Sequence, residues 1–257
     1  MRFVMAAILS LGCSSDSKIL DGVNIFTIDD DKELGMQLRD EISSRPEDFP
    51  LLDPGLYPEA YEHIYRIRDE ILATGEVRHA DDFDWETYII HDDDTLNAFC
   101  APGGYIYVYT GLIKFLEYED ELAGVMGHEI SHADQRHSTE QLTAAYGLST
   151  IIGLIFGEDP GLLTEIAAGL MRLSFSRADE SEADADSVHQ LCVTDYNAAG
   201  AAGFFEKLEG AAVPEFLSTH PSSDSRVEDI KGLASQLGCN TDNDPNADYQ
   251  AIIDSQP

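Results

Sequence analysis

The stretch from Glu119 to His137 constrains the fold more than any other part of this sequence. Acidic residues fill its first turn, where they favour a helix N-terminus, and it contains no proline. We therefore expect a helix over these residues. Within it, the segment HEISH places His128 and His132 four residues apart, so that both imidazoles project from one face about one turn apart. That spacing allows two ring nitrogens to reach one metal ion.

Glu129, between these histidines, is placed to take a proton from a metal-bound water rather than to bind the metal. Zinc, one ion per chain, is the expected metal, because it accepts nitrogen and oxygen ligands tetrahedrally and leaves one position open in catalytic sites. A five-residue pattern also arises by chance, and two histidines on a surface helix without a ligand are the alternative. The motif therefore needs a third ligand.

A third ligand is available in the segment SRADESEAD, residues Ser176 to Asp184. We expect it to be Glu180. Glu180 and Asp184 are again four residues apart, so one carboxylate can bind the metal while the other hydrogen-bonds a ligand histidine and fixes its tautomer. The alternative is an ordinary charged helix face that carries Glu180, Glu182 and Asp184.

The rest of the chain predicts further helices and two strands. Apolar residues at three and four spacing predict a helix from Pro58 to Leu72 that packs on the core. The segments ETYII (Glu86 to Ile90) and YIYVY (Tyr105 to Tyr109) predict neighbouring strands with a glycine turn before the second. Further helices are expected over residues 146–156, 160–191, 197–208 and 223–237. The apolar segment 146–156 is too short to span a membrane.

Charge excludes some classes of partner. The 257 residues include 49 acidic and 15 basic side chains, for a formal net charge of −34. Electrostatic attraction to nucleic acid or to anionic lipid is therefore excluded. The length fits one domain, and the hydrophobic fraction of 43% is that of a globular protein.

The N-terminus has the features of an export signal: Arg2, then an apolar run, then small residues before Cys13. It resembles a bacterial lipoprotein signal in which cleavage after Gly12 leaves Cys13 lipidated; a simple secretory signal is the alternative. We expect a signal over residues 1–12, a tether over 13–33, one catalytic domain over 34–237 and an acidic tail over 238–257. The expected location is the periplasmic side of a bacterial envelope, anchored to the outer membrane through Cys13.

The remaining cysteines lie in a compartment that tolerates disulfides. A bridge between Cys192 and Cys239 would tie the tail to the domain and leave Cys100 as a free thiol. The alternative is three small buried hydrophobic residues.

Four stretches together resemble the HtpX, BepA and CAAX prenyl protease type of zinc metallopeptidase, a gluzincin family numbered forty-eight. They are NAFCAPGGYIYVYTGLI (97–113), EDELAGVMGHEISHADQRH (119–137), SRADESEAD and THPSSDSRV (219–227). The resemblance implies a mainly helical α+β, zincin-like domain with a small sheet that borders the active-site cleft. It also implies His128, His132 and Glu180 as zinc ligands.

The resemblance suggests roles for other residues. The strand edge and turn after Asn97, with Ala98, Phe99, Gly103 and Gly104, would bind an extended peptide by strand addition.

His220 and Arg226 lie near the metal in relatives. They would steady the oxyanion of the reaction, or His220 would instead occupy the open zinc position and hold the enzyme latent. Asp184 and His137 would support the ligands from behind.

The expected function is hydrolysis of internal peptide bonds. Zinc would lower the pKa of its bound water, Glu129 would take the proton, and the hydroxide would attack the carbonyl. Unfolded or misfolded envelope proteins are the expected substrates, the lipid at Cys13 the only membrane contact, and a monomer the expected state. The alternative is a holdase or assembly factor with a latent or structural zinc site.

Overall fold

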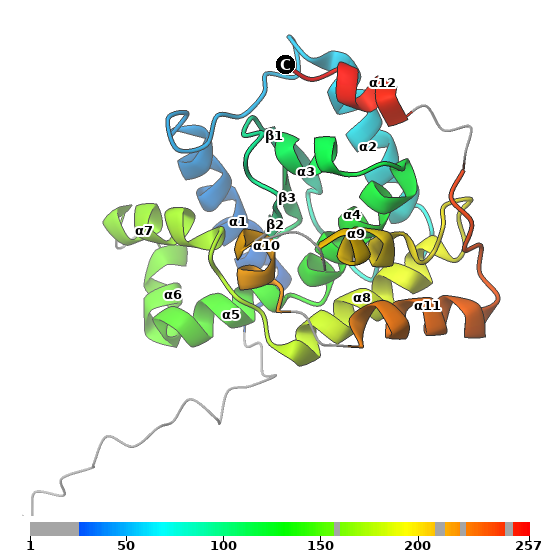
Figure 1. The fold of residues 1–257 in the computed structure, drawn as a ribbon. Helices are drawn as coiled ribbons and strands as arrows, with labels where there is room; N and C mark the ends of the chain where they lie inside the picture. The colour runs from blue at the N-terminus through cyan, green and yellow to red at the C-terminus, as the bar shows by residue number, and fades with distance from the viewer. Residues whose placement is uncertain (1–25, 157–159, 209–213, 222–224, 245–248) are drawn as a thin grey trace, which may run out of the picture.

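The computed structural model describes residues 26–156, 160–208, 214–221, 225–244 and 249–257, and Figure 1 shows their arrangement. Helices surround a small sheet, so the expected mainly helical α+β fold is confirmed. The helices are α1 (Ile28–Ser43), α2 (Pro58–Leu72), α3 (Thr110–Phe115), α4 (Glu119–Asp134), α5 (His137–Tyr146), α6 (Leu148–Ile155), α7 (Pro160–Leu170), α8 (Arg177–Leu191), α9 (Gly200–Leu208), α10 (Pro214–Thr219), α11 (Arg226–Leu237) and α12 (Tyr249–Asp254).

The sheet has the strand order β1-β3-β2, where β1 spans Glu86–Ile90, β2 Ala98–Ala101 and β3 Tyr105–Tyr109. The two predicted strands are confirmed, and they pair in parallel, with Ile89 opposite Val108. Strand β2 pairs antiparallel with β3 through a turn in which Gly103 and Gly104 have φ of 78° and 89°. Glycine adopts this left-handed backbone without the steric cost of a side chain.

The two faces of the sheet pack against different helices. One face is aromatic: the Phe99 and Tyr107 rings stack with centroids 4.7 Å apart, in one apolar cluster with residues of α1, α6 and α7. The other face belongs to a cluster with residues of α2 and α4. The apolar residues that predicted α2, including Ile64 and Ile67, are all buried there. The sheet therefore separates α6 and α7 from most of α4.

Helix α4 lies at the centre of the molecule and all its residues are buried. It packs chiefly against α8 and α9. Gly124 allows the close approach to α9, because a Cβ there would lie 2.1 Å from the backbone nitrogen of Ala201. Gly200 on α9 faces the same contact, since its Cβ would lie 2.0 Å from the carbonyl oxygen of Asp120. Helices α4 and α9 therefore pack closely along the part of α4 that precedes the HEISH motif.

Two long helices were predicted where the structure has breaks. Helix α4 ends at Asp134 rather than His137, because Arg136 adopts a left-handed conformation with φ of 67° and turns the chain into α5. The Arg136 guanidinium holds this turn through the buried carboxylate of Asp31, at 2.5 Å, and the carbonyl of Phe26, at 2.6 Å. The predicted helix over 160–191 is also wrong, since α7 ends at Leu170 and α8 begins at Arg177.

The folded part extends beyond the expected boundaries. Helix α1 begins at Ile28, where the sequence had suggested a tether up to residue 33, because Thr27 caps the helix. In the expected tail, α12 buries Tyr249 and Ile252. The Cys192–Cys239 bridge is confirmed, and Cys100 is a buried free thiol. The expected signal over 1–12 and the lipidation site Cys13 lie outside the described residues.

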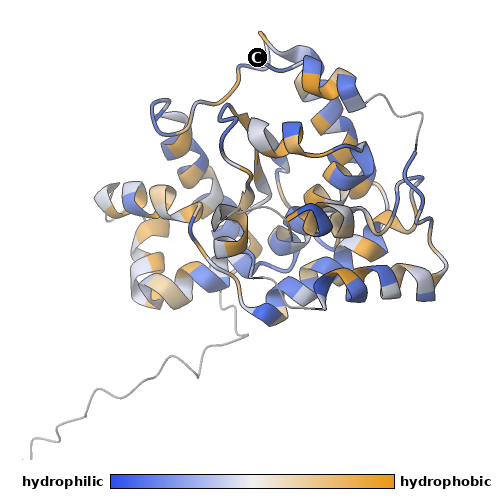
Figure 2. Ribbon diagram, in the orientation of Figure 1, coloured by the Kyte–Doolittle hydropathy of each residue, from blue (hydrophilic) through white to orange (hydrophobic). Residues whose placement is uncertain are grey.

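Hydropathy varies between helices, and Figure 2 shows α6 and α7 with few hydrophilic residues. Even so, within the described ranges no helix combines the length and hydropathy that a membrane span requires.

Candidate metal centre

Helix α4 brings its two histidines together as the spacing predicts. The Nε2 atoms of His128 and His132 lie 3.0 Å apart, and both rings are buried. Helix α8 packs alongside α4 and adds Glu180, whose carboxylate oxygens lie 3.5 Å from His128 Nε2 and 3.3 Å from His132 Nε2. The three expected ligands thus converge on one point, although the first, His128, and the last, Glu180, are 52 residues apart in the sequence.

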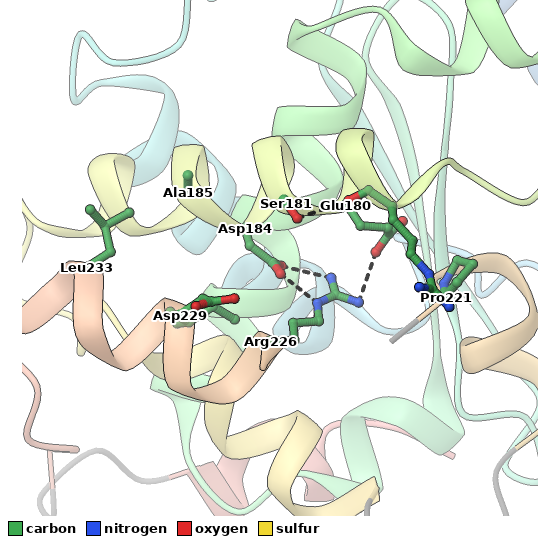
Figure 3. Close-up of a pocket in the computed structure, with 10 residues that line it drawn as sticks. Glu180, Ser181, Asp184, Ala185, Pro221, Arg226, Asp229 and Leu233 are labelled. Atoms are coloured by element: carbon green, nitrogen blue, oxygen red, sulfur yellow. Dashed lines mark hydrogen bonds and ion pairs between the residues drawn. The ribbon is translucent and has the colours of Figure 1, made fainter. Parts of the chain in front are cut away.

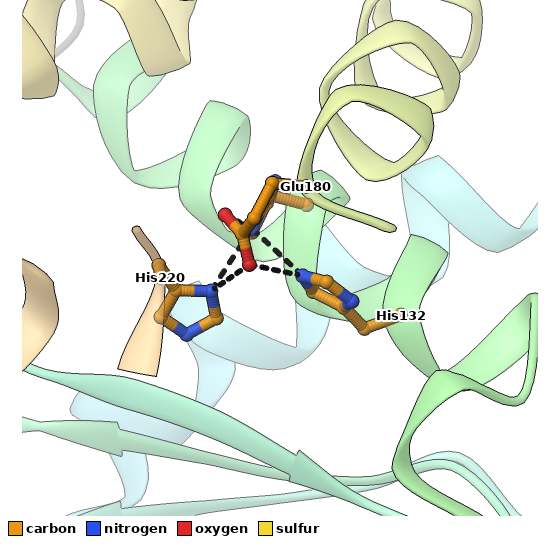
Figure 4. A group of neighbouring side chains, drawn as sticks. His132, Glu180 and His220 are labelled. Atoms are coloured by element: carbon orange, nitrogen blue, oxygen red, sulfur yellow. Dashed lines mark hydrogen bonds and ion pairs between the residues drawn. The ribbon is translucent and has the colours of Figure 1, made fainter. Parts of the chain in front are cut away.

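His220 completes the group. It follows α10, is fully buried, and places its Nδ1 atom 3.0 Å from Glu180 Oε1 and 3.2 Å from His128 Nε2. Figure 4 shows the Glu180 carboxylate between the rings of His220 and His132. The His220 ring stacks on Phe216, and this contact holds the imidazole in its orientation. Of the two roles expected for His220, the position inside the ligand group matches occupation of the fourth metal position.

The four side chains fit a zinc ion. One ligand atom from each of His128, His132, Glu180 and His220 can be chosen so that all lie within 4.8 Å of one another. Ligands about 2.1 Å from a tetrahedral zinc ion are roughly 3.4 Å apart, close to the separations found here. Three imidazoles and one carboxylate are also donors that zinc accepts.

The charges of the group depend on one another. Burial disfavours the charged form of His128, but hydrogen bonds to Asp184 and Glu180 outweigh this, so the pKa of His128 rises to about 9. Burial would raise the pKa of Glu180, yet the positive charge of His220 and hydrogen bonds from His128 and His132 hold it well below its usual value. Burial, and then the charge on His128, holds the pKa of His132 far below its ordinary value. Glu180 is therefore ionised, as a metal ligand requires.

Glu129 is a fully buried carboxylate whose two oxygens accept no hydrogen bond from any described residue. Burial raises its pKa. The nearest described cation-forming group is His220, whose Nε2 atom is 3.4 Å from Glu129 Oε1. A buried carboxylate without a donor is costly, so its presence beside the ligand group points to a role in chemistry rather than in folding.

Asp184 and Arg226 contact the side chains of the expected ligands. Asp184 lies 3.0 Å from His128 Nδ1, on the side of that ring away from Glu180, as the helix spacing predicts. The buried Arg226 donates to both oxygens of Asp184, at 2.6 and 2.8 Å, and forms an ion pair of 2.9 Å with Glu180. Its guanidinium also lies 3.8 Å from the centre of the Phe205 ring. These contacts favour a positioning role; the expected oxyanion role stays a prediction.

His132 is supported by two further rings. Its Nδ1 atom is 2.9 Å from Nδ1 of the buried His137, whose Nε2 atom lies 3.6 Å from Glu182. Burial lowers the pKa of His137, which favours the neutral form that can accept a hydrogen bond from His132. Phe175 stacks on the His132 ring with centroids 3.9 Å apart. Nothing in the sequence pattern indicated Phe175 or Phe216.

The expected peptide-binding edge is closed in this structure. Asn97, Ala98 and Phe99 are buried, although β2 is an edge strand of the sheet. The reason is α5, where the Ser138 hydroxyl donates to the Cys100 carbonyl at 3.0 Å and so covers the free side of β2.

The other expected binding residues lie elsewhere. The structure does not bring Gly103 and Gly104 to the metal centre: Gly103 packs against α1, and Gly104 against Trp85. The ring of Phe99 lies in the apolar cluster that the sheet forms with residues of α1, α6 and α7. By contrast, the buried Cys100 thiol lies close enough to Glu129 that burial, and then this carboxylate, raise its pKa.

Comparison with known proteins agrees with the geometry of the site. The family model described as peptidase family M48 matches residues 60–234. The mitochondrial metalloendopeptidase OMA1 of Arabidopsis thaliana is 36% identical over 159 residues, or 60% of this chain and 32% of that protein.

Two further relatives cover different shares of the chain. The Schizosaccharomyces pombe OMA1 protein is 30% identical over 216 residues, or 81% of this chain and 62% of the relative. The beta-barrel assembly-enhancing protease of Escherichia coli (strain K12) is 31% identical over 168 residues, or 58% of this chain and 34% of the relative. The matches span about a third to three fifths of the length of these curated relatives.

Proposed function

The chain belongs to peptidase family M48, and on that premise we propose that it is a zinc-dependent endopeptidase. His128, His132 and Glu180 hold the metal in this proposal. The observation that carries it is the convergence of these three side chains, buried, beside the unpartnered carboxylate of Glu129. The names of the relatives, two metalloendopeptidases and a protease, support the same reaction class.

The residues of this chain divide the work of hydrolysis. A zinc ion bound at the centre supplies the Lewis acidity that activates water and polarises the peptide carbonyl near neutral pH. Glu129 accepts the proton from the attacking water and then donates it to the leaving amine; its raised pKa brings it closer to the operating pH, where general catalysis is most efficient. Asp184 and Arg226 hold His128 and Glu180 in place meanwhile.

We further propose that the described conformation is a latent one. His220 lies between Glu129 and Glu180, at 3.4 and 3.0 Å, in the space that water and substrate need. The metal centre is buried and the edge of β2 is covered. Turnover then requires His220 to leave the fourth position and the β2 edge to open, after which an extended peptide can pair with β2 near Ala98.

The proposed substrates are unfolded or misfolded proteins of the bacterial envelope, approached from a periplasmic location with Cys13 as a lipid anchor. The name of the Escherichia coli relative, a β-barrel assembly-enhancing protease, supports the proposed location in the envelope. The OMA1 relatives are mitochondrial by name, so their names do not support a bacterial envelope and the location requires its own experiment. Fractionation of cells that express the wild type and Cys13→Ala would decide it.

The test of activity is cleavage of casein by the purified chain loaded with zinc. Wild type should cleave, a chelator should abolish cleavage, and Glu129→Gln should lower kcat/KM by about 10²–10⁴-fold while thermal stability is retained, because it removes a general base. Full turnover by Glu129→Gln would refute the mechanism.

His220→Ala should raise turnover, because it vacates the fourth position, whereas His189→Ala, an exposed histidine on α8, should leave it unchanged. A binding protein with a structural zinc site is the alternative, because a buried centre closed by four ligands also suits it. Casein binding without cleavage by both zinc-loaded wild type and zinc-loaded His220→Ala would establish that alternative.

A further inference from the structure

A cavity of about 180 Å³ lies between α8 and α11, beside the metal centre (Figure 3). Glu180 and Arg226, joined by their ion pair of 2.9 Å, form its inner end. The exposed side chains of Arg177 and Asp229 lie at its outer part. Its apolar lining comes from Ala185, Pro221, Ile230 and Leu233.

The cavity shares two elements with the centre. Glu180 lines it and also lies 3.0 Å from His220. Pro221 lines it and directly follows His220 in the chain. A backbone movement that takes His220 out of the ligand group would displace Pro221 as well, because the two residues are covalently joined. One residue of the cavity lining, Pro221, is thus adjacent in the chain to the histidine whose departure would activate the proposed enzyme.

Size and charge decide what the cavity accepts. An apolar cavity of about 150 Å³ in another protein holds a benzene molecule, so the space here suits a side chain between leucine and phenylalanine. Asp184 and Glu180 already neutralise the Arg226 guanidinium at the inner end. A charged side chain that entered would lose its water and find no free counter-charge among the lining residues at that end, which is unfavourable.

We propose that this cavity is a specificity pocket, which takes the apolar side chain of the substrate residue that flanks the cleaved bond. This inference rests on the proposed endopeptidase function and deepens it by naming the substrate class: segments with leucine-sized to phenylalanine-sized apolar residues, as unfolded proteins expose. Leu233 and Ala185, from opposite walls, set the size of the pocket.

The test is a cleavage profile. Zinc-loaded wild type and His220→Ala are given a mixture of peptides, and the cleaved bonds are identified by mass spectrometry. One position beside the cleaved bond should favour leucine or phenylalanine over alanine by at least about tenfold in kcat/KM. Ala185→Leu, which fills the cavity, should remove that preference, and Leu233→Ala should shift it towards larger side chains. Leu237→Ala, one turn later on α11 and outside the cavity, should leave the profile unchanged.

A second readout does not need turnover. The catalytically inactive Glu129→Gln variant should bind the preferred peptide at least about tenfold more tightly than its alanine analogue, and the added Ala185→Leu substitution should abolish this difference. Melting temperatures of all variants show that they are folded. Casein cleavage with no apolar preference, or with a preference that Ala185→Leu leaves intact, overturns the pocket alone. Absence of all cleavage by both wild type and His220→Ala overturns the proposed function and the pocket with it.

Discussion

Two pairs of helices in this molecule are built on opposite principles. The α4–α8 pair meets through ionisable side chains, and yet α4 is buried along its whole length. The α6–α7 pair consists mainly of apolar residues, and yet Ile152 is 38% exposed and Phe156, just after α6, is 77% exposed. Burial therefore does not follow hydropathy here. Polar groups can be buried where each has a partner of opposite charge, as Asp184 and Arg226 do.

The two helix pairs differ in how their residues contribute to stability and chemistry. In the α4–α8 pair, removal of one partner leaves another charge buried without compensation. In the α6–α7 pair, Ile151, Leu154 and Ile166 contribute apolar packing to the cluster that contains Phe99 and Tyr107. Substitutions in the two pairs should differ in both the size and the kind of their effects.

The largest effect is expected for Arg226→Met. It removes the guanidinium from the buried carboxylates of Asp184 and Glu180 and leaves them only the neighbouring histidines as partners, so the free energy of unfolding in chelator should fall by about 3–5 kcal/mol. Chemical denaturation measures this. Lys231→Met on the same helix removes an exposed ion pair with Glu206 and should cost about 1 kcal/mol or less. Equal losses in the two variants would erase the contrast between buried and exposed charges.

A smaller effect is expected for Leu154→Ala in α6. Leu154 is 2% exposed, and the lost contacts and the residual cavity should cost about 2–3 kcal/mol. Zinc bound per folded molecule, measured by mass spectrometry of the metal, should stay at the wild-type value because the substitution touches no ligand. Loss of zinc from a folded Leu154→Ala protein would show that the two helix pairs are coupled.

The smallest effect is expected for Phe156→Ser. Because this side chain is mostly exposed, the change in unfolding free energy should remain within about 0.5 kcal/mol. Thermal unfolding of Phe156→Ser and Leu154→Ala, measured side by side, compares the loss of stability at an exposed and at a buried position two residues apart. A loss as large as that of Leu154→Ala would mean that Phe156 is covered in solution.

The same contrast explains which structural features the sequence predicted. The start of α4 followed from the acidic residues of its first turn, and four-residue spacing placed His128 with His132 and Glu180 with Asp184 on shared helix faces. The meeting of the two faces was implied by the family resemblance. The break before α8 was missed, although Ser176 and Asp179 form a capping box whose S-x-x-D pattern was visible. Thr27 and Asp30 form the same motif at the missed start of α1.

Other features could not follow from local pattern. The left-handed Arg136 depends on Asp31, 105 residues earlier, and the cover over β2 depends on Ser138 of α5. Phe175 and Phe216 reach the histidines only through tertiary packing. Strand β2, with the sequence AFCA, lacks β-branched residues that would have indicated a strand.

The proposed function depends on the metal centre, and its most direct test is anomalous diffraction at the zinc edge from crystals of the zinc-loaded chain. One peak is predicted, with nitrogen ligands of His128 and His132 at about 2.0–2.1 Å and an oxygen of Glu180 at about 2.0–2.2 Å. His220 is predicted to supply the fourth ligand in the proposed latent form. A well-ordered centre without a peak, or a peak bound by other residues, would contradict the account.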